Sequence, residues 1–229
     1  MDPKEYALIV AGGKGTRIPG HTPKQFLVLG DRPMLMHTIE AFQKYSKHIQ
    51  IILVLAAEEF GQWQALCAAY NFNKPLTLQQ GGVSRFQSVK NGLSCIEEDG
   101  LVAIHDGARP LVTPGIIKAS FDLARSGSSA VACVPLKESL RKIGGEDSFA
   151  VNRTDYRLIQ TPQTFSVNLI RKAYEVAEDI DLTDDASVAE RAGNKINLFQ
   201  GSYENIKITT TEDVWLAEAL LMARSTSQQ

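Results

Sequence analysis

The residues best suited to chemistry stand in short polar motifs that follow apolar runs. The first is Ala11-Gly12-Gly13-Lys14-Gly15-Thr16-Arg17, at the end of the apolar segment Tyr6 to Ala11. Three glycines within four positions let backbone N–H groups approach a ligand, and such a nest binds anions. A P-loop needs its lysine after the last glycine, and a dinucleotide fingerprint needs a small residue where Ile18 stands. The motif therefore predicts an anion site of another kind, with Lys14 and Arg17 supplying positive charge.

Two further motifs carry groups of the same chemistry. Pro23-Lys24-Gln25 sets a lysine beside a rigid proline, where it can face the same anion. Gly81-Gly82-Val83-Ser84-Arg85, with Ser88, is a second glycine turn that leads into a predicted helix. Helix N-termini favour anions. On these residues alone, a simple strand-to-helix connection explains the second turn equally well.

The motif His105-Asp106-Gly107-Ala108-Arg109-Pro110 closes an apolar run at its carboxyl end. Ligand sites of open parallel sheets lie at that edge. Asp106 is therefore a candidate contact for a metal ion or a hydroxyl group. A salt bridge between Asp106 and Arg109 is the alternative, which we disfavour, and we expect a structural role for His105.

More polar residues follow in the second half of the chain. Arg153 and Lys207 add two cations, and Gln160-Thr161-Pro162-Gln163 lies between them. Thr183-Asp184-Asp185-Ala186 predicts a helix cap, with its acidic residues near the positive end of the helix.

The elements that position these motifs alternate between strand and helix, which predicts an α/β fold. We expect a Rossmann-like, mostly parallel sheet with helices on both faces. Apolar runs predict strands at residues 6–11, 49–56, 76–78, 101–105, 130–134, 196–199 and 205–208. Helical periodicity predicts helices at 33–45, 58–70, 83–97, 114–126 (capped by Thr113), 167–178, 184–192 and 212–223.

Between residues 135 and 161 the pattern changes to alternating charged and apolar residues around Gly144-Gly145-Glu146-Asp147. This predicts a β-hairpin arm at about 136–159, projecting from a single domain that spans residues 1–229. Because a lone two-stranded arm is marginally stable, we predict that it serves a homodimer.

Composition excludes several classes of protein. The 229 residues include 24 basic and 26 acidic ones, so a nucleic acid is not an expected partner. Apolar runs are too short to span a membrane, and residues 1–5 lack an apolar signal core. Three widely spaced cysteines favour reduced thiols. We therefore expect a cytoplasmic protein.

Taken together and in this order, the motifs resemble the 2-C-methyl-D-erythritol 4-phosphate cytidylyltransferase family over residues 5 to 224. The resemblance implies an enzyme that converts CTP and methylerythritol phosphate to the CDP-alcohol and pyrophosphate, with Mg²⁺ or another divalent cation. Asp106 is a candidate ligand for that cation; otherwise the phosphates of CTP hold it.

The resemblance also implies a role for each site residue. Catalysis would rest on Arg17, Lys24 and Lys207, which hold the triphosphate and its developing charge. The nucleotide would contact Ala11, Gly12, Gly13, Gly15, Gly82, Ser88 and Gly107. The polyol phosphate would contact Asp106, Arg109 and Thr161, together with Ser139 and Arg153 on the arm of a partner subunit.

The sequence departs from the family pattern at Gly12, Gly107 and Val83, where two alanines and an acidic residue are common. Three alternatives remain open at this point. They are a ribitol-5-phosphate cytidylyltransferase, a sugar nucleotidyltransferase that uses another base, and a non-catalytic nucleotide-binding protein on the same fold.

Overall fold

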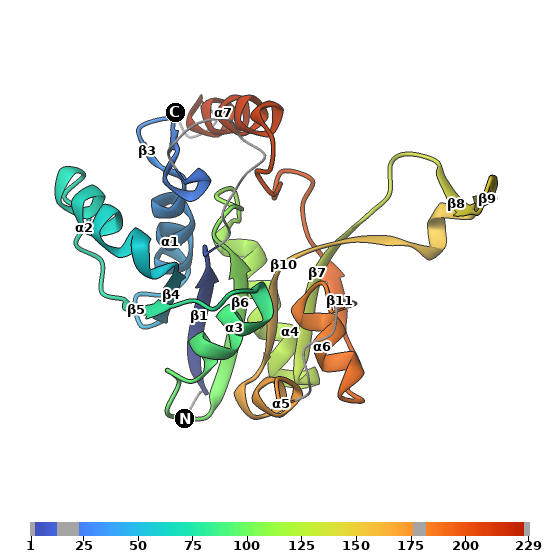
Figure 1. The fold of residues 1–229 in the computed structure, drawn as a ribbon, viewed down its shortest axis with the longest axis horizontal. Coiled ribbons are helices and arrows are strands. Elements are labelled where there is room, and N and C mark those ends of the chain that lie inside the picture. Colours follow the sequence, from blue (N-terminus) through green and yellow to red (C-terminus); the bar gives the residue numbers. More distant parts are fainter. Residues whose placement is uncertain (1–2, 13–22, 176–181, 227–229) are drawn as a thin grey trace.

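The computed structural model describes residues 3–12, 23–175 and 182–226. A seven-stranded sheet lies at its centre (Figure 1). In spatial order its strands are β11 (Leu198–Gln200), β7 (Ser129–Pro135), β10 (Arg157–Ser166), β6 (Gly100–Asp106), β1 (Lys4–Val10), β4 (Gln50–Leu55) and β5 (Thr77–Gln80). All neighbouring pairs are parallel except the two that β10 makes with β6 and β7. The predicted mostly parallel α/β sheet is confirmed.

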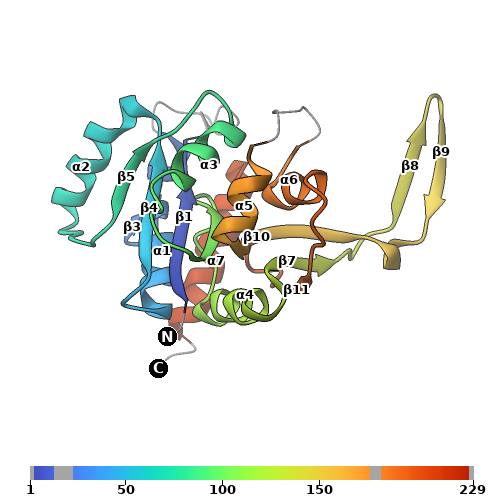
Figure 2. The ribbon, with the colours of Figure 1, turned by 90° about the horizontal axis from the view of Figure 1, so that it is seen from below.

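Helices cover both faces of this sheet (Figures 1 and 2). The α-helices are α1 (Met34–Tyr45), α2 (Phe60–Ala69), α3 (Arg85–Leu93), α4 (Pro114–Gly127), α5 (Val167–Ala173), α6 (Asp185–Arg191) and α7 (Thr211–Thr226). Short 3-10 turns lie at η1 (Lys24–Phe26), η2 (Ala57–Glu59) and η3 (Arg153–Asp155). None of the helices within the described ranges is long and apolar enough to cross a bilayer.

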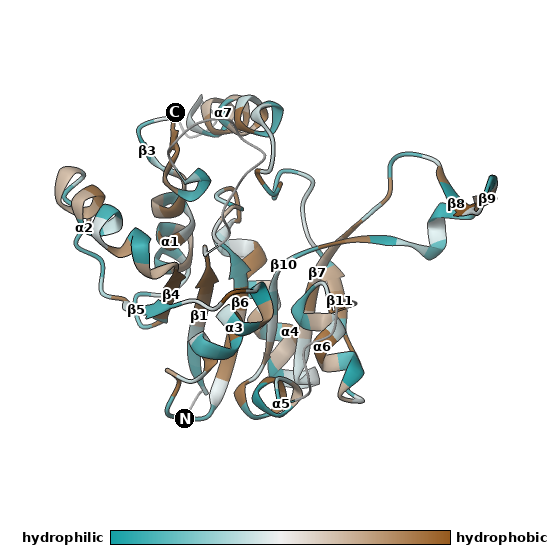
Figure 3. Ribbon diagram, in the orientation of Figure 1, coloured by the Kyte–Doolittle hydropathy of each residue, from teal (hydrophilic) through white to brown (hydrophobic). Residues whose placement is uncertain are grey.

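Alternate side chains of the central strands build two separate cores, because successive residues of a strand point to opposite faces. In β1, Ala7 and Ile9 pack with α1, α2 and α4, whereas Tyr6 and Leu8 pack with α3, α5 and α6. These strands are apolar along most of their length (Figure 3). A third, smaller apolar cluster includes Ala217 of α7, Ile208, and Ala108 from the loop that follows β6.

The hairpin arm has the predicted form. Strands β8 (Leu140–Gly144) and β9 (Asp147–Val151) pair antiparallel and project away from the main sheet (Figures 1 and 2). A second small pair, β2 (Val28–Leu29) and β3 (Arg32–Pro33), precedes α1.

The structure differs from the predicted elements in several places. Helix α3 covers Arg85–Leu93 rather than 83–97, because Ser84 caps its start and the chain turns after Leu93. Residues 205–208 form no strand; Ile208 N–H instead donates to the Ala108 carbonyl at 2.8 Å. Strand β10 was not predicted. Helix α5 ends at Ala173, and the predicted end at 178 lies outside the described residues. The predicted cap of α4 is confirmed, since Thr113 accepts a hydrogen bond from Ile116 N–H.

Candidate active site

Two cavities adjoin each other at the carboxyl edge of the parallel strands. The first has a volume of about 670 Å³ and the second about 550 Å³. They share three lining residues, namely Arg85, Asp106 and Lys207. Strand β6 ends at Asp106, so the fold delivers this carboxylate to the boundary between the cavities.

Backbone turns line the first cavity. Ala11 and Gly12 follow β1, and Gly81 and Gly82 follow β5. The Gly82 N–H donates to the Ser88 hydroxyl at 3.1 Å, which in turn donates to the Ser84 carbonyl at 2.8 Å. This arrangement needs glycine, because a Cβ on Gly82 would lie 2.3 Å from Cβ of Gln87.

Two lysines contribute positive charge to the wall of the first cavity. Lys24 lies in η1 on one wall, and Lys207 lies at the boundary with the second cavity. A pocket with exposed backbone and two lysines suits a nucleotide and its phosphates. The predicted contacts Ala11, Gly12, Gly82 and Ser88 therefore lie together, as expected.

The second cavity is built from β10, α6 and the end of β6. Arg109, Thr161 and Asp184 line it, together with Gln163. The register of β10 against β7 shifts between Ile159 and Gln163, and such irregularities often re-aim side chains next to sites. Asp184 caps α6 as predicted, and its carboxylate also accepts from Nε2 of Gln163 at 2.8 Å.

Asp106 is surrounded by cations. Its Oδ2 lies 3.1 Å from Nζ of Lys207 and 3.3 Å from Nε of Arg109, and its Oδ1 lies 3.6 Å from Nε of Arg85. Burial favours a higher pKa for Asp106, but the charges of Arg85, Lys207 and Arg109 outweigh it and hold that pKa well below its usual range. The disfavoured Asp106–Arg109 salt bridge is therefore present, and the preference against it was wrong.

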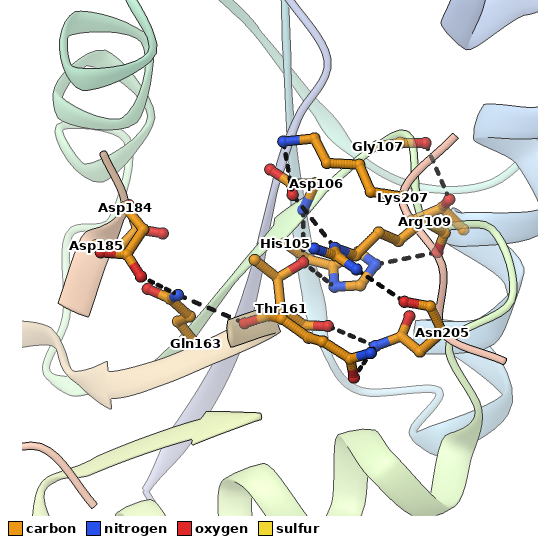
Figure 4. Close-up of polar contacts among 12 residues, drawn as sticks. His105, Asp106, Gly107, Arg109, Thr161, Gln163, Asp184, Asp185, Asn205 and Lys207 are labelled. Atoms are coloured by element: carbon orange, nitrogen blue, oxygen red, sulfur yellow. Dashed lines mark hydrogen bonds and ion pairs between the residues drawn. The ribbon is translucent and has the colours of Figure 1, made fainter. Parts of the chain in front are cut away.

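His105 and Thr161 fix the loop that carries these groups (Figure 4). The Asp106 N–H donates to the Thr161 hydroxyl at 3.1 Å, and that hydroxyl lies 3.0 Å from Nδ1 of His105. Nε2 of His105 lies 3.2 Å from the Arg109 carbonyl, so it donates there and Nδ1 accepts from Thr161. Burial lowers the pKa of His105 to about 4, which keeps the ring neutral. The structural role expected for His105 fits these contacts.

Asn205 holds Arg109 from the other side. Nη1 of Arg109 donates to the Asn205 carbonyl at 2.7 Å, and Nδ2 of Asn205 donates to the Thr161 carbonyl at 2.8 Å (Figure 4). Although residues 205–208 are no strand, they position both Arg109 and Lys207.

Two residues of this site, Arg85 and Asp185, were not predicted as site residues from the sequence, which gave Asp185 only a place in a helix cap. The Arg85 guanidinium binds the carboxylate of Asp185 through two hydrogen bonds of 2.9 and 2.7 Å. Asp185 is fully buried and also accepts from the Tyr174 hydroxyl at 2.6 Å. Arg85 stood within a quoted motif, but its partner lies 100 positions away, and no local spacing reveals that pair.

Several expected site residues lie elsewhere. Gly107 is absent from both cavity walls of the described chain, and its N–H and C=O bond to Val10 and Thr38. A Cβ there would meet that of Ala11 at 2.8 Å, so close packing requires glycine at this position; its contact with the nucleotide stays a prediction. Ser139 and Arg153 lie on and beside the arm, away from both cavities. Gly13, Gly15 and Arg17 lie outside the described residues.

The surroundings of Asp106 do not match the requirements of a divalent cation. Hard cations bind several oxygen ligands, whereas both carboxylate oxygens of Asp106 already face cationic side chains. Across the described ranges, no group of three or more His, Cys, Asp or Glu side chains could hold a metal ion. Asp106 in this arrangement does not fit the metal-ligand role considered for it.

A mostly parallel sheet with a glycine-lined cavity, an adjoining polar cavity and cations between them suits an enzyme that joins a nucleotide to a second substrate. Residues 6–223 match the family model described as 2-C-methyl-D-erythritol 4-phosphate cytidylyltransferase. The chain belongs to this family, and it is a cytidylyltransferase enzyme.

Individual relatives agree with this assignment. A Bacteroides thetaiotaomicron protein of that name is 45% identical over 218 residues, which cover 95% of this chain and 100% of the relative. A Bacillus cytotoxicus protein of the same name is 37% identical and covers 94% and 97%. The crystal structure of 4-diphosphocytidyl-2C-methyl-D-erythritol synthase from Anaerococcus prevotii superposes with a TM-score of 0.84 at 27% identity, covering 96% of each chain.

Proposed function

We propose that the first cavity binds CTP and that the second binds 2-C-methyl-D-erythritol 4-phosphate. The observation that carries this division is the wall shared by the two cavities, made of Arg85, Asp106 and Lys207. Substrates in adjoining cavities meet at that wall, where the acceptor phosphate can attack the α-phosphorus of CTP in line. A new P–O bond forms, and pyrophosphate leaves with the electrons of the broken one.

Positioning and charge stabilisation supply most of the catalysis in such a transfer. Lys24 and Lys207 stabilise the negative charge that develops on the triphosphate. Arg109 holds the acceptor phosphate, and Asp106 fixes Lys207 and Arg109 by its short ion pairs. Ala11, Gly82 and Ser88 contact the base, and Thr161 orders the acceptor side through His105.

We propose that Mg²⁺ or a similar ion reaches the site on the phosphate oxygens of CTP, which are hard ligands of the kind it prefers. Bound there, it would neutralise phosphate charge. The crowding of cations around Asp106 supports this source of ligands over a protein-built site.

We also propose a homodimer joined through the arm. Ile143 and Phe149 of the hairpin are 70% and 56% exposed, which is unfavourable for apolar side chains on an arm that stands alone. In such a dimer, Ser139 and Arg153 would reach the acceptor cavity of the partner subunit. Sedimentation of the wild-type protein should give a dimer, and the I143S/F149S variant should give a monomer. A wild-type monomer at micromolar concentration would refute this proposal.

The cytoplasm is the compartment we propose, since the three cysteines are free thiols. The family model and the quoted relatives carry the methylerythritol name, so they favour that acceptor over ribitol phosphate. Nothing in them favours a silent nucleotide-binding protein.

The decisive assay is pyrophosphate release with CTP and Mg²⁺, with methylerythritol 4-phosphate and ribitol 5-phosphate offered in parallel. We expect release with the first acceptor and little with the second. Release with ribitol phosphate alone would assign the other acceptor, and release with neither would refute the proposed reaction. A chelator should abolish the release.

A further inference from the structure

Arg85 lies where three parts of the site meet. It is the first residue of α3, directly after the glycine turn of the nucleotide cavity and its cap Ser84. Its two terminal nitrogens bind Asp185, the first residue of α6, while its Nε faces Asp106. All three guanidinium nitrogens therefore face carboxylates of the protein.

Asp185 binds the guanidinium of Arg85 from a buried position. Its side chain is 0% exposed, and besides Arg85 it is bonded by the Tyr174 hydroxyl. A buried carboxylate of this kind strongly favours a bidentate arginine partner. Because Asp185 anchors the guanidinium, the position of Arg85 is fixed independently of either substrate.

We propose that Arg85, anchored by Asp185, is a positioning residue that sets Asp106 and Lys207 between the two substrates and fixes the α6 wall of the acceptor cavity. The inference rests on the proposed function, because it concerns how that site is held. It assigns Arg85 no contact with the reacting atoms.

Loss of Arg85 would affect catalysis through the residues that it contacts. Without Arg85, the carboxylate of Asp106 has only Arg109 and Lys207 as close cations, and it draws both toward itself. Lys207 is then held away from the phosphates. At the same time, Asp185 loses its charge partner, so the first turn of α6, which carries Asp184 and Ala186 on the cavity wall, is no longer fixed. The first effect weakens the stabilisation of transition-state charge and so lowers kcat, and the second falls on the binding of the acceptor.

A purely structural ion pair would predict a different pattern, and a double variant separates the two. Removing Arg85 alone leaves a buried, unpaired charge on Asp185, which destabilises the fold. The variant R85M/D185N removes both charges, so it should recover much of the thermal stability lost in R85M. It still leaves Asp106 without Arg85, so it should not recover activity.

The test measures initial rates and thermal unfolding midpoints for the wild type, R85K, R85M, R85M/D185N and the control R32M. Arg32 is a matched control because it bridges Asp31 and Glu40 with a side chain 33% exposed, against 29% for Arg85, and it is absent from the walls of both cavities. We expect R85M to lower kcat/KM for the polyol phosphate on the order of 100-fold, as for a misplaced reacting group. R85K should fall between R85M and the wild type, because lysine keeps the charge but not the fork.

The strongest test compares the KM for the polyol phosphate with the KM for CTP. In R85M and in the double variant, kcat and the KM for the polyol phosphate should change, while the KM for CTP stays within about threefold. Recovery of activity together with stability in R85M/D185N would overturn the inference, as would an equal loss in R32M. If the wild type itself releases no pyrophosphate, the proposed function fails; if it is active and R85M matches it, only this inference fails.

Discussion

Replacing Lys207 with alanine tests the shared wall of the two cavities most simply. The Lys207 ammonium lies 3.1 Å from Oδ2 of Asp106, and its side chain is 40% exposed and lines both cavities. A group that acts mainly on transition-state charge contributes about 2.7–4 kcal/mol. Its removal should therefore lower kcat by about 100- to 1,000-fold.

The effect of Lys207→Ala on folding should be small. Partly exposed ion pairs contribute about 0–1 kcal/mol, and Asp106 keeps Arg85 and Arg109 as partners. The thermal midpoint should then fall by no more than about 4 °C. Lys118→Ala is a suitable control, because Lys118 is an exposed lysine that pairs with Asp122 and does not line either cavity. Pyrophosphate release by a Lys207→Ala variant at more than a third of the wild-type rate would refute the reasoning.

Two further predictions concern the nucleotide turn and acid stability. Gly82→Ala should raise the KM for CTP at least tenfold, which corresponds to about 1.4 kcal/mol of lost binding free energy, because the new Cβ would lie 2.3 Å from Cβ of Gln87. Gly12→Ala should change this KM little, because the nearest atom to its new Cβ would lie 3.7 Å away. Burial lowers the pKa of His105 from 6.5 to about 4, so the unfolded chain binds more protons between these values. The free energy of unfolding should therefore be highest above pH 6.5 and fall by about 3 kcal/mol toward pH 4. Urea titrations at several pH values measure this slope, which His105→Gln should flatten; an unchanged slope in that variant would exclude His105 as its source.

The parallel core was predictable because its strands carry continuous apolar runs. Strands β4 and β6 are buried on both faces, so their sequences show little besides apolar residues. Strand β10 was missed for the opposite reason. Gln160 and Gln163 face polar partners at the acceptor cavity, and Pro162 interrupts the run, so this part of the sheet lacks an apolar pattern. Strand β10 therefore helps to form the second cavity, but its sequence lacks the apolar pattern by which the other strands were predicted.

Several residues of the candidate site could be predicted from the sequence, but the ion pairs between them could not. Asp106 was marked by its place at the end of a strand, because the topology of a parallel sheet brings strand ends to one edge. Lys24 and Lys207 were singled out by the motifs around them, since neither lies at the end of a strand. The cations around Asp106 come from positions 85, 109 and 207, and only the fold brings the first and last of these to it. The salt bridge between Asp106 and Arg109 was disfavoured, although Asp106 carries three ion pairs.

We propose that both substrates occupy adjoining cavities at once and meet at Asp106 and Lys207. Initial rates of pyrophosphate release, measured over a matrix of CTP and methylerythritol 4-phosphate concentrations, test it directly. Double-reciprocal lines that intersect are predicted, because transfer requires a complex with both substrates. Parallel lines would contradict the account, since they would mean that pyrophosphate leaves before the acceptor binds.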